Sequence, residues 1–134
     1  MKYLLDTNIC IFVIKKKPAL VLQRFVQQPA DEVGISSVTL AELRYGADKS
    51  AAPARNHAAL DGFLAPILVA DFDSLAADRY GKVRTYVEQQ GTPIGPLDTM
   101  IAAHALSLAT TLVTNNTSEF SRVPGLVWED WTLP

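Results

Sequence analysis

Three observations predict that this chain folds as a three-layer α/β/α sandwich with a parallel sheet of about five strands. Short apolar runs recur along the sequence, and segments with helical signals separate them. With 134 residues, 49% of them hydrophobic, the chain has the length of one domain and enough apolar side chains for one core. Short apolar strands that alternate with helices are typical of a parallel sheet covered on both faces. We therefore expect a single domain over residues 1–134.

The strands are predicted from five short apolar runs. The first, residues 3–5, ends at Asp6 and is expected to be buried. The others are residues 33–35, 67–69, 111–113 and 126–128. Open α/β sheets bind ligands in the loops at the carboxyl ends of their strands, so polar residues just after these runs are the first candidates for a site.

Helices are expected between the strands, because prolines, glycines and capping residues mark their ends. Pro53 stands where a first helical residue would, Asp73 is a candidate N-cap, and Gly91 ends the helix that follows Asp73. Either Ser37 or Thr39 is expected to cap the helix after the second strand. The expected helices cover residues 9–14, 19–28, a segment up to about 47, 53–64, 74–90 and 97–109, with at most one turn over 118–121.

Composition excludes several classes of protein. The chain has 12 Lys and Arg against 14 Asp and Glu, a net charge of −2, which excludes a disordered tail protein and argues against binding nucleic acid by bulk charge. No apolar run approaches the ~20 residues that a membrane span needs. One cysteine, Cys10, excludes an internal disulfide and an all-cysteine zinc site. Asp6 interrupts what would be the apolar stretch of a signal peptide, so we expect a cytoplasmic protein.

Four acidic residues are predicted to meet at one edge of the sheet. Asp6 ends the first strand, and Glu42 lies in the first turns of the helix after the second. Asp98 lies in the first turn of the helix before the fourth strand, and Glu119 follows that strand. Clustered carboxylates repel one another, and a divalent cation such as Mg²⁺ or Mn²⁺ removes that repulsion. A site of this kind can align a water for attack on a phosphodiester, so phosphodiester hydrolysis is the expected reaction.

Each acid also has a purely structural interpretation. Asp6 can cap a helix after its strand, and Asp98 can complement a helix dipole. Residues 39–42 (TLAE) fit a capping box, which by itself is the simpler explanation of Glu42. Glu119 alone is a solvated surface acid. Only the joint placement of the four favours a catalytic site.

Four ordered motifs resemble those of the PIN-domain ribonucleases, and within them the VapC toxins of bacterial type II toxin–antitoxin modules. They are residues 4–8 (LLDTN), 35–43 (ISSVTLAEL), 95–98 (GPLD) and 113–120 (VTNNTSEF). The resemblance implies an α/β/α sandwich and a Mg²⁺ site, with Mn²⁺ as an alternative. Asp6 and Asp98 would be the principal metal ligands, and Glu42 would bind the metal or position the attacking water.

The resemblance also implies supporting roles at the site. Thr7 and Ser37 match small hydroxyl residues that support the acids. Asn115 and Asn116 stand where many relatives place an aspartate, so either Asn116 or Glu119 completes the acidic site, with one metal ion or two. Of the two, we expect Glu119 to complete the site as a catalytic residue, with a metal contact that is direct or through water.

Substrate and partners also come from the resemblance alone. Toxins of the enterobacterial type cut initiator tRNA in the anticodon stem-loop and stop translation. Their relatives are typically homodimers. A VapB antitoxin holds them inactive in a hetero-oligomer, and the antitoxin often presents an arginine to the acids. No membrane partner is expected.

Two other functions compete with the ribonuclease. A phosphatase of the haloacid-dehalogenase kind also begins with an aspartate after its first strand, but it needs a second acid two residues later, where this chain has Asn8. A catalytically impaired PIN fold that acts only through its partner would fit the departure at Asn115 and Asn116. The presence of Asp6, Glu42 and Asp98 argues against that alternative.

Overall fold

A five-stranded parallel sheet forms the centre of the protein. The structure, a computed structural model, describes residues 1–134. The strands are β1 (Tyr3–Leu5), β2 (Val33–Ser36), β3 (Leu68–Ala70), β4 (Thr111–Val113) and β5 (Trp128–Glu129). Their order in the sheet is β3-β2-β1-β4-β5, and every neighbouring pair is parallel. The predicted α/β fold with a parallel sheet is therefore confirmed, and β1 lies in its middle.

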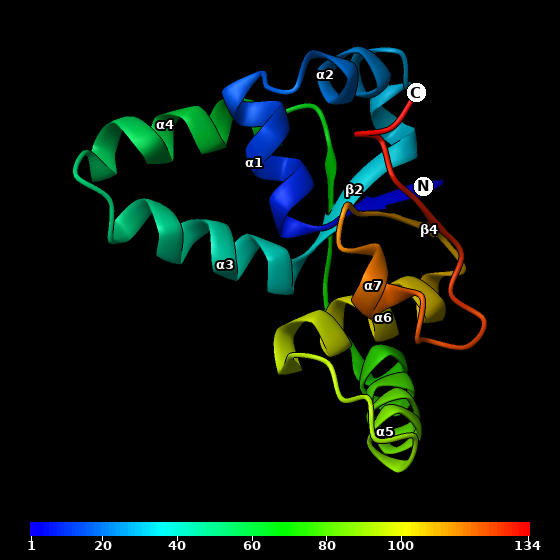
Figure 1. Ribbon diagram of the computed structural model, residues 1–134. Coiled ribbons are helices and arrows are strands. Elements are labelled where there is room, and N and C mark those ends of the chain that lie inside the picture. Colours follow the sequence, from blue (N-terminus) through cyan, green and yellow to red (C-terminus); the bar gives the residue numbers. More distant parts are fainter.

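Helices cover both faces of this sheet. They are α1 (Thr7–Lys15), α2 (Ala19–Val26), α3 (Ser37–Asp48), α4 (Pro53–Leu64), α5 (Ser74–Gln89), α6 (Pro96–Leu108) and the single turn α7 (Thr117–Phe120). Helices α1 to α4 lie on one side of the sheet, and α5 and α6 lie on the other (Figure 1). The predicted three layers are thus present.

The two outer strands are displaced from their predicted positions. Strand β3 begins at Leu68 because the Ile67 amide donates to the Leu64 carbonyl in the turn that ends α4. Strand β5 begins at Trp128, since the Leu126 amide still turns back to the Val123 carbonyl. Hydrophobic runs alone did not distinguish these turn residues from the strands that follow them.

The start of α3 also differs from its prediction. Strand β2 extends to Ser36, and the Ser36 hydroxyl accepts from the Val38 amide at 3.0 Å, so Ser36 is the N-cap. Neither Ser37 nor Thr39 caps the helix. Thr39 is fully buried, and its hydroxyl has no hydrogen-bond partner. The capping-box interpretation of Glu42 is therefore wrong, because it requires Thr39 at the cap.

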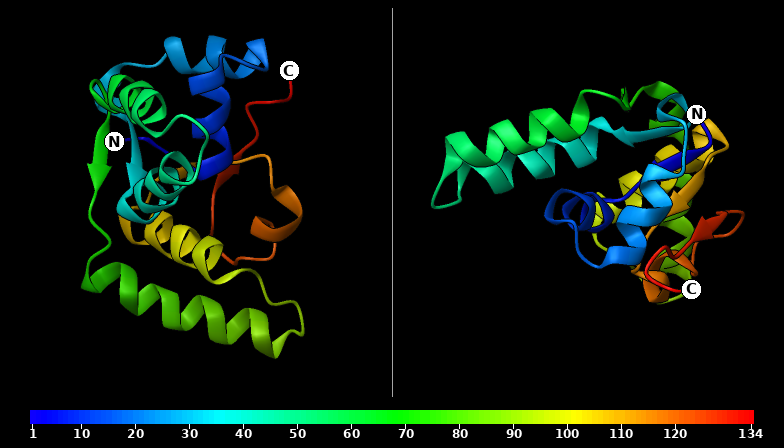
Figure 2. Two further views of the ribbon diagram at one scale, coloured as in Figure 1. Left: turned by 90° about the vertical axis from the view of Figure 1, so that its left-hand side faces the viewer. Right: turned by 90° about the horizontal axis from the view of Figure 1, so that it is seen from above.

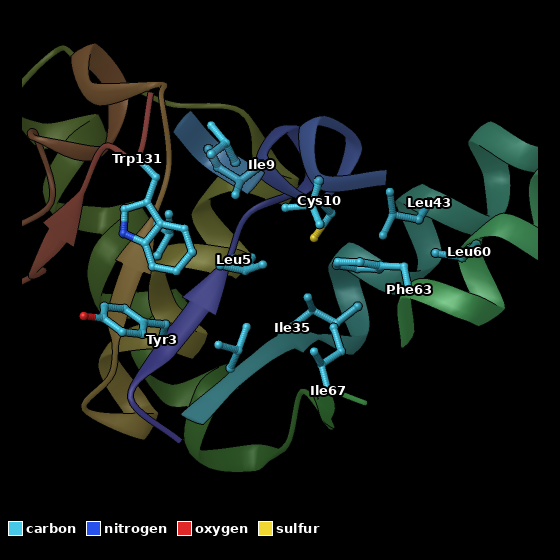
Figure 3. Packing of buried hydrophobic residues seen from close by; sticks show 14 residues of the cluster. Tyr3, Leu5, Ile9, Cys10, Ile35, Leu43, Leu60, Phe63, Ile67 and Trp131 are labelled. Carbon is cyan, nitrogen blue, oxygen red and sulfur yellow. The ribbon is translucent and has the colours of Figure 1, made fainter. Parts of the chain in front are cut away.

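The apolar core is divided by the sheet into two clusters. The larger one joins β1 and β2 to α1–α4 and is closed by Trp131, whose ring meets Tyr3 edge-on at 5.1 Å between centroids (Figure 3). Cys10 is fully buried there, as a small apolar side chain would be. The second cluster joins the opposite face to α5 and α6.

Helices α3 and α4 form a hairpin that projects from the body of the molecule (Figure 2, right). Arg44 of α3 links the two helices, because its guanidinium donates to Asp61 at 2.7 Å and to His57 Nδ1 at 3.0 Å. Pro53 begins α4, as expected. No helix combines the length and apolar character that crossing a bilayer would require.

Candidate active site

Asp6 is the most firmly held of the four predicted acids. It follows β1 and caps α1, so the Ile9 amide donates to its Oδ1 at 2.9 Å. The Thr114 hydroxyl, at the end of β4, donates to its Oδ2 at 2.5 Å. Asp6 is only 4% exposed, and this burial raises its pKa to about 6 although both hydrogen bonds act to lower it. Repulsion from Glu42 and Asp130 adds to the increase.

Glu42 faces α1 instead of the start of its own helix. The Thr7 hydroxyl donates to Glu42 Oε1 at 2.6 Å, a contact between residues 35 positions apart. This hydrogen bond fixes the carboxylate next to the helix that Asp6 caps. Thr7 therefore supports an acid at this edge, and Glu42 lies close enough to Asp6 to raise the pKa of its carboxyl.

Asp98 and Glu119 form a second group. Asp98 lies in the first turn of α6, is partly buried, and has a pKa raised to about 7. Burial is the largest cause, followed by a hydrogen bond with Glu119 and repulsion from Glu119, Glu42 and Asp6. With a pKa of about 7, the Asp98 carboxyl releases its proton at a higher pH than an ordinary aspartate does.

The segment after β4 orients Glu119. The Asn116 side-chain amide donates to Glu119 Oε2 at 3.0 Å, while the Asn116 backbone amide donates to the Thr114 hydroxyl at 2.9 Å. A chain of hydrogen bonds thus connects Glu119 to Asp6 through Asn116 and Thr114. Asn115 is exposed, and its side chain makes no hydrogen bond. Of the two asparagines, the structure therefore brings only Asn116 to an acid.

Ser37 is close to the site without touching an acid. Its hydroxyl accepts from the Phe72 amide at 3.0 Å, which ties the start of α3 to the segment after β3. It also lines a groove together with Thr7 and Glu42. Ser37 therefore supports the site by fixing the start of α3, without a contact to an acid.

Two residues at this edge were missing from the sequence prediction. Thr114 holds Asp6, and Asp130 raises the pKa of Asp6 by repulsion. Both follow strands of the sheet, β4 and β5, at the carboxyl ends. The rule that polar residues just after the strands are site candidates identified Asp6 and applies to both. Thr114 was missed because it carries no charge, and Asp130 was missed because β5 was predicted to end earlier.

The donor set fits a hard divalent cation. Asp6, Glu42, Asp98 and Glu119 offer only carboxylate oxygens, and repulsion among these acids adds to the burial that raises the pKa values of Asp6 and Asp98. No three acidic, histidine or cysteine side chains already stand in the arrangement of a metal-ligand cluster. Asp6 is held in place by its two hydrogen bonds, whereas Asp98 has the Glu119 carboxyl as its hydrogen-bonding neighbour.

Comparisons with known proteins identify the family. The PIN domain model matches residues 3–126. The tRNA(fMet)-specific endonuclease VapC of Shigella flexneri is 53% identical over 132 residues, with 98% of this chain and 99% of that protein covered. Its counterpart in Salmonella typhimurium, with the same name, is 49% identical and 98% of each chain is covered.

Solved structures agree with this assignment. A chain in the DNA-bound VapBC crystal structure from Salmonella typhimurium superposes with a TM-score of 0.92 at 49% identity, covering 98% of both chains. A chain in VapBC2 from Rickettsia felis, bound to a DNA fragment from its promoter, gives 0.92 at 42% identity and covers 98% of this chain and 99% of that one. The protein therefore belongs to the PIN-domain family, in its VapC group.

Proposed function

We propose that this protein is a metal-dependent endoribonuclease that cuts initiator tRNA in the anticodon stem-loop and acts as the toxin of a toxin–antitoxin pair. The observation that carries the proposal is the 53% identity, over nearly the whole chain, with a tRNA(fMet)-specific endonuclease. The four carboxylates at the carboxyl edge of the sheet supply the chemistry that such an enzyme needs. Cleavage of this tRNA would stop translation and implies action in the cytoplasm.

Asp6 and Asp98 are the residues that would hold the metal, with Glu42 and Glu119 binding it directly or through water. PIN-domain nucleases generally use divalent metals, and we propose Mg²⁺, with Mn²⁺ as a substitute. When bound, the ion polarises a phosphodiester oxygen and lowers the pKa of a water molecule.

The surrounding side chains would orient these acids. Thr114 and the Ile9 amide fix both oxygens of Asp6, so this ligand loses little conformational freedom on binding. Thr7 holds one oxygen of Glu42 and leaves the other free to accept a proton from the attacking water. Asp98, with its pKa raised to about 7, would have to lose its proton to act as a ligand, so activity should increase as the pH rises through about 7.

A VapB-type antitoxin is the proposed partner. Two of the structures that this chain resembles are VapBC complexes with DNA. We propose that this chain likewise forms a homodimer and assembles with its antitoxin into a hetero-oligomer that blocks the acidic edge. An arginine from the antitoxin would suit the charge of the four carboxylates.

The test uses purified, antitoxin-free protein. It is incubated with initiator tRNA and, in parallel, with elongator methionine tRNA, in Mg²⁺ or in EDTA. We expect one cut, in the anticodon stem-loop of the initiator tRNA only, and no cut in EDTA. Asp6→Asn and Asp98→Asn should abolish cleavage, while Asp78→Asn, an exposed acid on α5, should leave it unchanged. Cleavage that survives EDTA would overturn the metal site, and uncut tRNA with intact protein would favour a binding-only PIN fold.

A further inference from the structure

A groove runs from the acidic edge along α3, and none of the proposed catalytic residues lies at its far end. It has a volume of about 760 Å³ and begins at Thr7 and Glu42. Tyr45 of α3 and Lys49, which caps the end of that helix, line one wall, while Leu97 and Met100 of α6 line the other. Leu97 precedes Asp98, so both walls of this α3–α6 groove lead directly to proposed catalytic acids.

The α3 wall presents an aromatic ring and a cation. Glu42, Tyr45 and Lys49 are three and four residues apart in turn, which places them on one face of the helix. Tyr45 is 64% exposed. The Lys49 ammonium lies 4.7 Å from the centre of the Tyr45 ring and forms no salt bridge. The ammonium thus lies over one face of the ring, without a carboxylate partner, and its charge can meet an anion there.

Gly46 keeps this groove open. It lies inside α3, where glycine costs about 0.5–1 kcal/mol relative to alanine. A Cβ added at Gly46 would meet no atom within 4 Å, so packing does not require the glycine. Gly46 lines the α3–α6 groove beside Glu42 and Tyr45. A side chain at this position would project into space that a ligand can use.

We infer that the α3–α6 groove holds one base of the RNA strand next to the bond that is cut, with the base stacked on Tyr45 and its phosphate bound by Lys49. This inference rests on the proposed function and names a binding residue for the same site. Exposed aromatic rings stack on unpaired bases, and lysine neutralises the backbone phosphate. No carboxylate of this chain neutralises Lys49, and the phosphate backbone of RNA complements its charge, so an RNA strand is the occupant that we propose. An unpaired base is what a loop of a folded RNA presents.

The experiment measures binding separately from cleavage. Fluorescence anisotropy of labelled initiator tRNA in EDTA gives the dissociation constant of uncut RNA for Tyr45→Ala, Tyr45→Phe, Lys49→Ala and Gly46→Leu. The matched controls carry the same changes on α5: Tyr86→Ala, Lys82→Ala and Gly81→Leu. Tyr86 is also exposed, and a Cβ at Gly81 also meets nothing within 4 Å. Thermal melting shows that each variant is folded.

We expect Tyr45→Ala and Gly46→Leu to weaken tRNA binding by roughly 5- to 150-fold, the range of losing one stacked base. Tyr45→Phe keeps the ring and should stay within about twofold of wild type. Lys49→Ala should weaken binding and reduce the slope of log affinity against log salt by about 1. The three α5 controls should bind as wild type does. With Mg²⁺, Tyr45→Ala should raise KM for the tRNA more than it lowers kcat.

Several outcomes would overturn the inference. One is normal tRNA binding by folded Tyr45→Ala and Gly46→Leu. Another is normal tRNA binding together with lost binding of a VapB-type antitoxin, which would make the groove a protein site. A third is a changed oligomeric state in light scattering, which would make Tyr45 an interface residue between copies of this chain. Wild-type protein that binds tRNA through Tyr45 but does not cut it in Mg²⁺ would overturn only the proposed activity, and wild type that does not bind would overturn both.

Discussion

The acids at the edge of the sheet fall into two groups that are held in different ways. Asp6 is fixed at both oxygens by Thr114 and the Ile9 amide, at the end of the central strand. Asp98 lies on a helix, and its hydrogen-bonding neighbour is another carboxyl, Glu119. Asp6 is thus held by two donors of the protein. In the second group only Glu119 has such a donor, the Asn116 side-chain amide, while Asp98 has the Glu119 carboxyl as its partner.

The two groups therefore differ in how firmly their carboxyl groups are positioned and in how their charge responds to pH. Burial raises the pKa of both aspartates, but only Asp6 has donors that oppose the increase. Asp6 is therefore fixed in position, whereas the charge of Asp98 changes as the pH passes about 7. The predictions below test this contrast.

The largest expected effect comes from removing the charge of Asp6. Asparagine has the same shape and keeps an acceptor for the Ile9 amide, so Asp6→Asn should fold normally. We expect Mg²⁺-dependent cleavage to fall by more than about 100-fold, beyond the range seen for residues that only orient a metal ligand. Glu119→Gln, in the adjustable group, should lose less. Rates of tRNA cleavage at saturating Mg²⁺ measure both, and equal losses would contradict the contrast.

The second effect concerns the donor that holds Asp6. Thr114→Val keeps the shape of the side chain but removes the hydrogen bond to Asp6 Oδ2 and the acceptor for the Asn116 amide. We expect affinity for Mn²⁺ to fall by about 10- to 100-fold in calorimetric titration. Thr110→Val, a buried threonine whose hydroxyl contacts only the Ala105 carbonyl, is the control and should not change it. Unchanged Mn²⁺ affinity in Thr114→Val would show that Asp6 needs no such support.

The third effect is on stability in the absence of metal. An aspartate with a pKa of 3.8 when unfolded binds its proton more tightly in the folded protein when its pKa is about 7, as for Asp98. The stabilisation from this proton is complete below about pH 4 and is lost as the pH rises through about 7. His104, whose pKa burial lowers, acts in the opposite direction. The comparison of wild type with Asp98→Asn isolates the carboxyl.

In EDTA, Asp98→Asn should therefore melt at a higher temperature than wild type, and the difference in Tm should grow between about pH 5 and pH 8. The expected gain at the higher pH is only about 2–4 °C, because Asp98 is partly exposed and solvent screening reduces the effect to roughly 1 kcal/mol or less. Circular dichroism melts measure it. A difference that stays constant over this range would mean that burial does not hold a proton on Asp98.

The smallest effect is expected at Asn116. Asn116→Ala removes the 3.0 Å hydrogen bond to Glu119 but keeps the backbone donor to Thr114. A partly exposed hydrogen bond contributes about 0.5–1.5 kcal/mol, so cleavage should fall only by about 2- to 10-fold. Asn115→Ala, whose side chain makes no hydrogen bond, is the matched control and should cleave at the wild-type rate. A larger loss in Asn115→Ala than in Asn116→Ala would reverse the assignment.

The sequence was enough to predict which acids lie at this edge of the sheet, because their placement depends on topology alone. Alternating strands and helices are enough to bring Asp6, Glu42 and Asp98 to one edge, because parallel strands all end on the same side. The hydrogen bond between Thr7 and Glu42 spans 35 residues, and its existence depends on how α1 and α3 pack. The pattern within one segment favoured Thr39 as the partner of Glu42, but the packing of the fold places Thr7 there instead.

Hydroxyl and aromatic side chains were the hardest to assign. Ser36, Ser37 and Thr39 all suit a helix N-cap, and the choice depends on the residue at which β2 ends. Tyr45 gives no signal in the sequence, because only the folded structure shows that its ring is exposed. Charge and periodicity thus located the acids, whereas their partners depend on contacts between distant segments.

The central place of β1 has a consequence for motion. Strand β1 is paired on both sides, and the Asp6 amide donates to the Val113 carbonyl at 3.0 Å. Amides in such a position exchange with water only when most of the molecule opens, so the Asp6 amide should exchange more slowly than the amides at the projecting end of the α3–α4 hairpin. The acid that follows β1 is thus held by a part of the backbone that rarely opens.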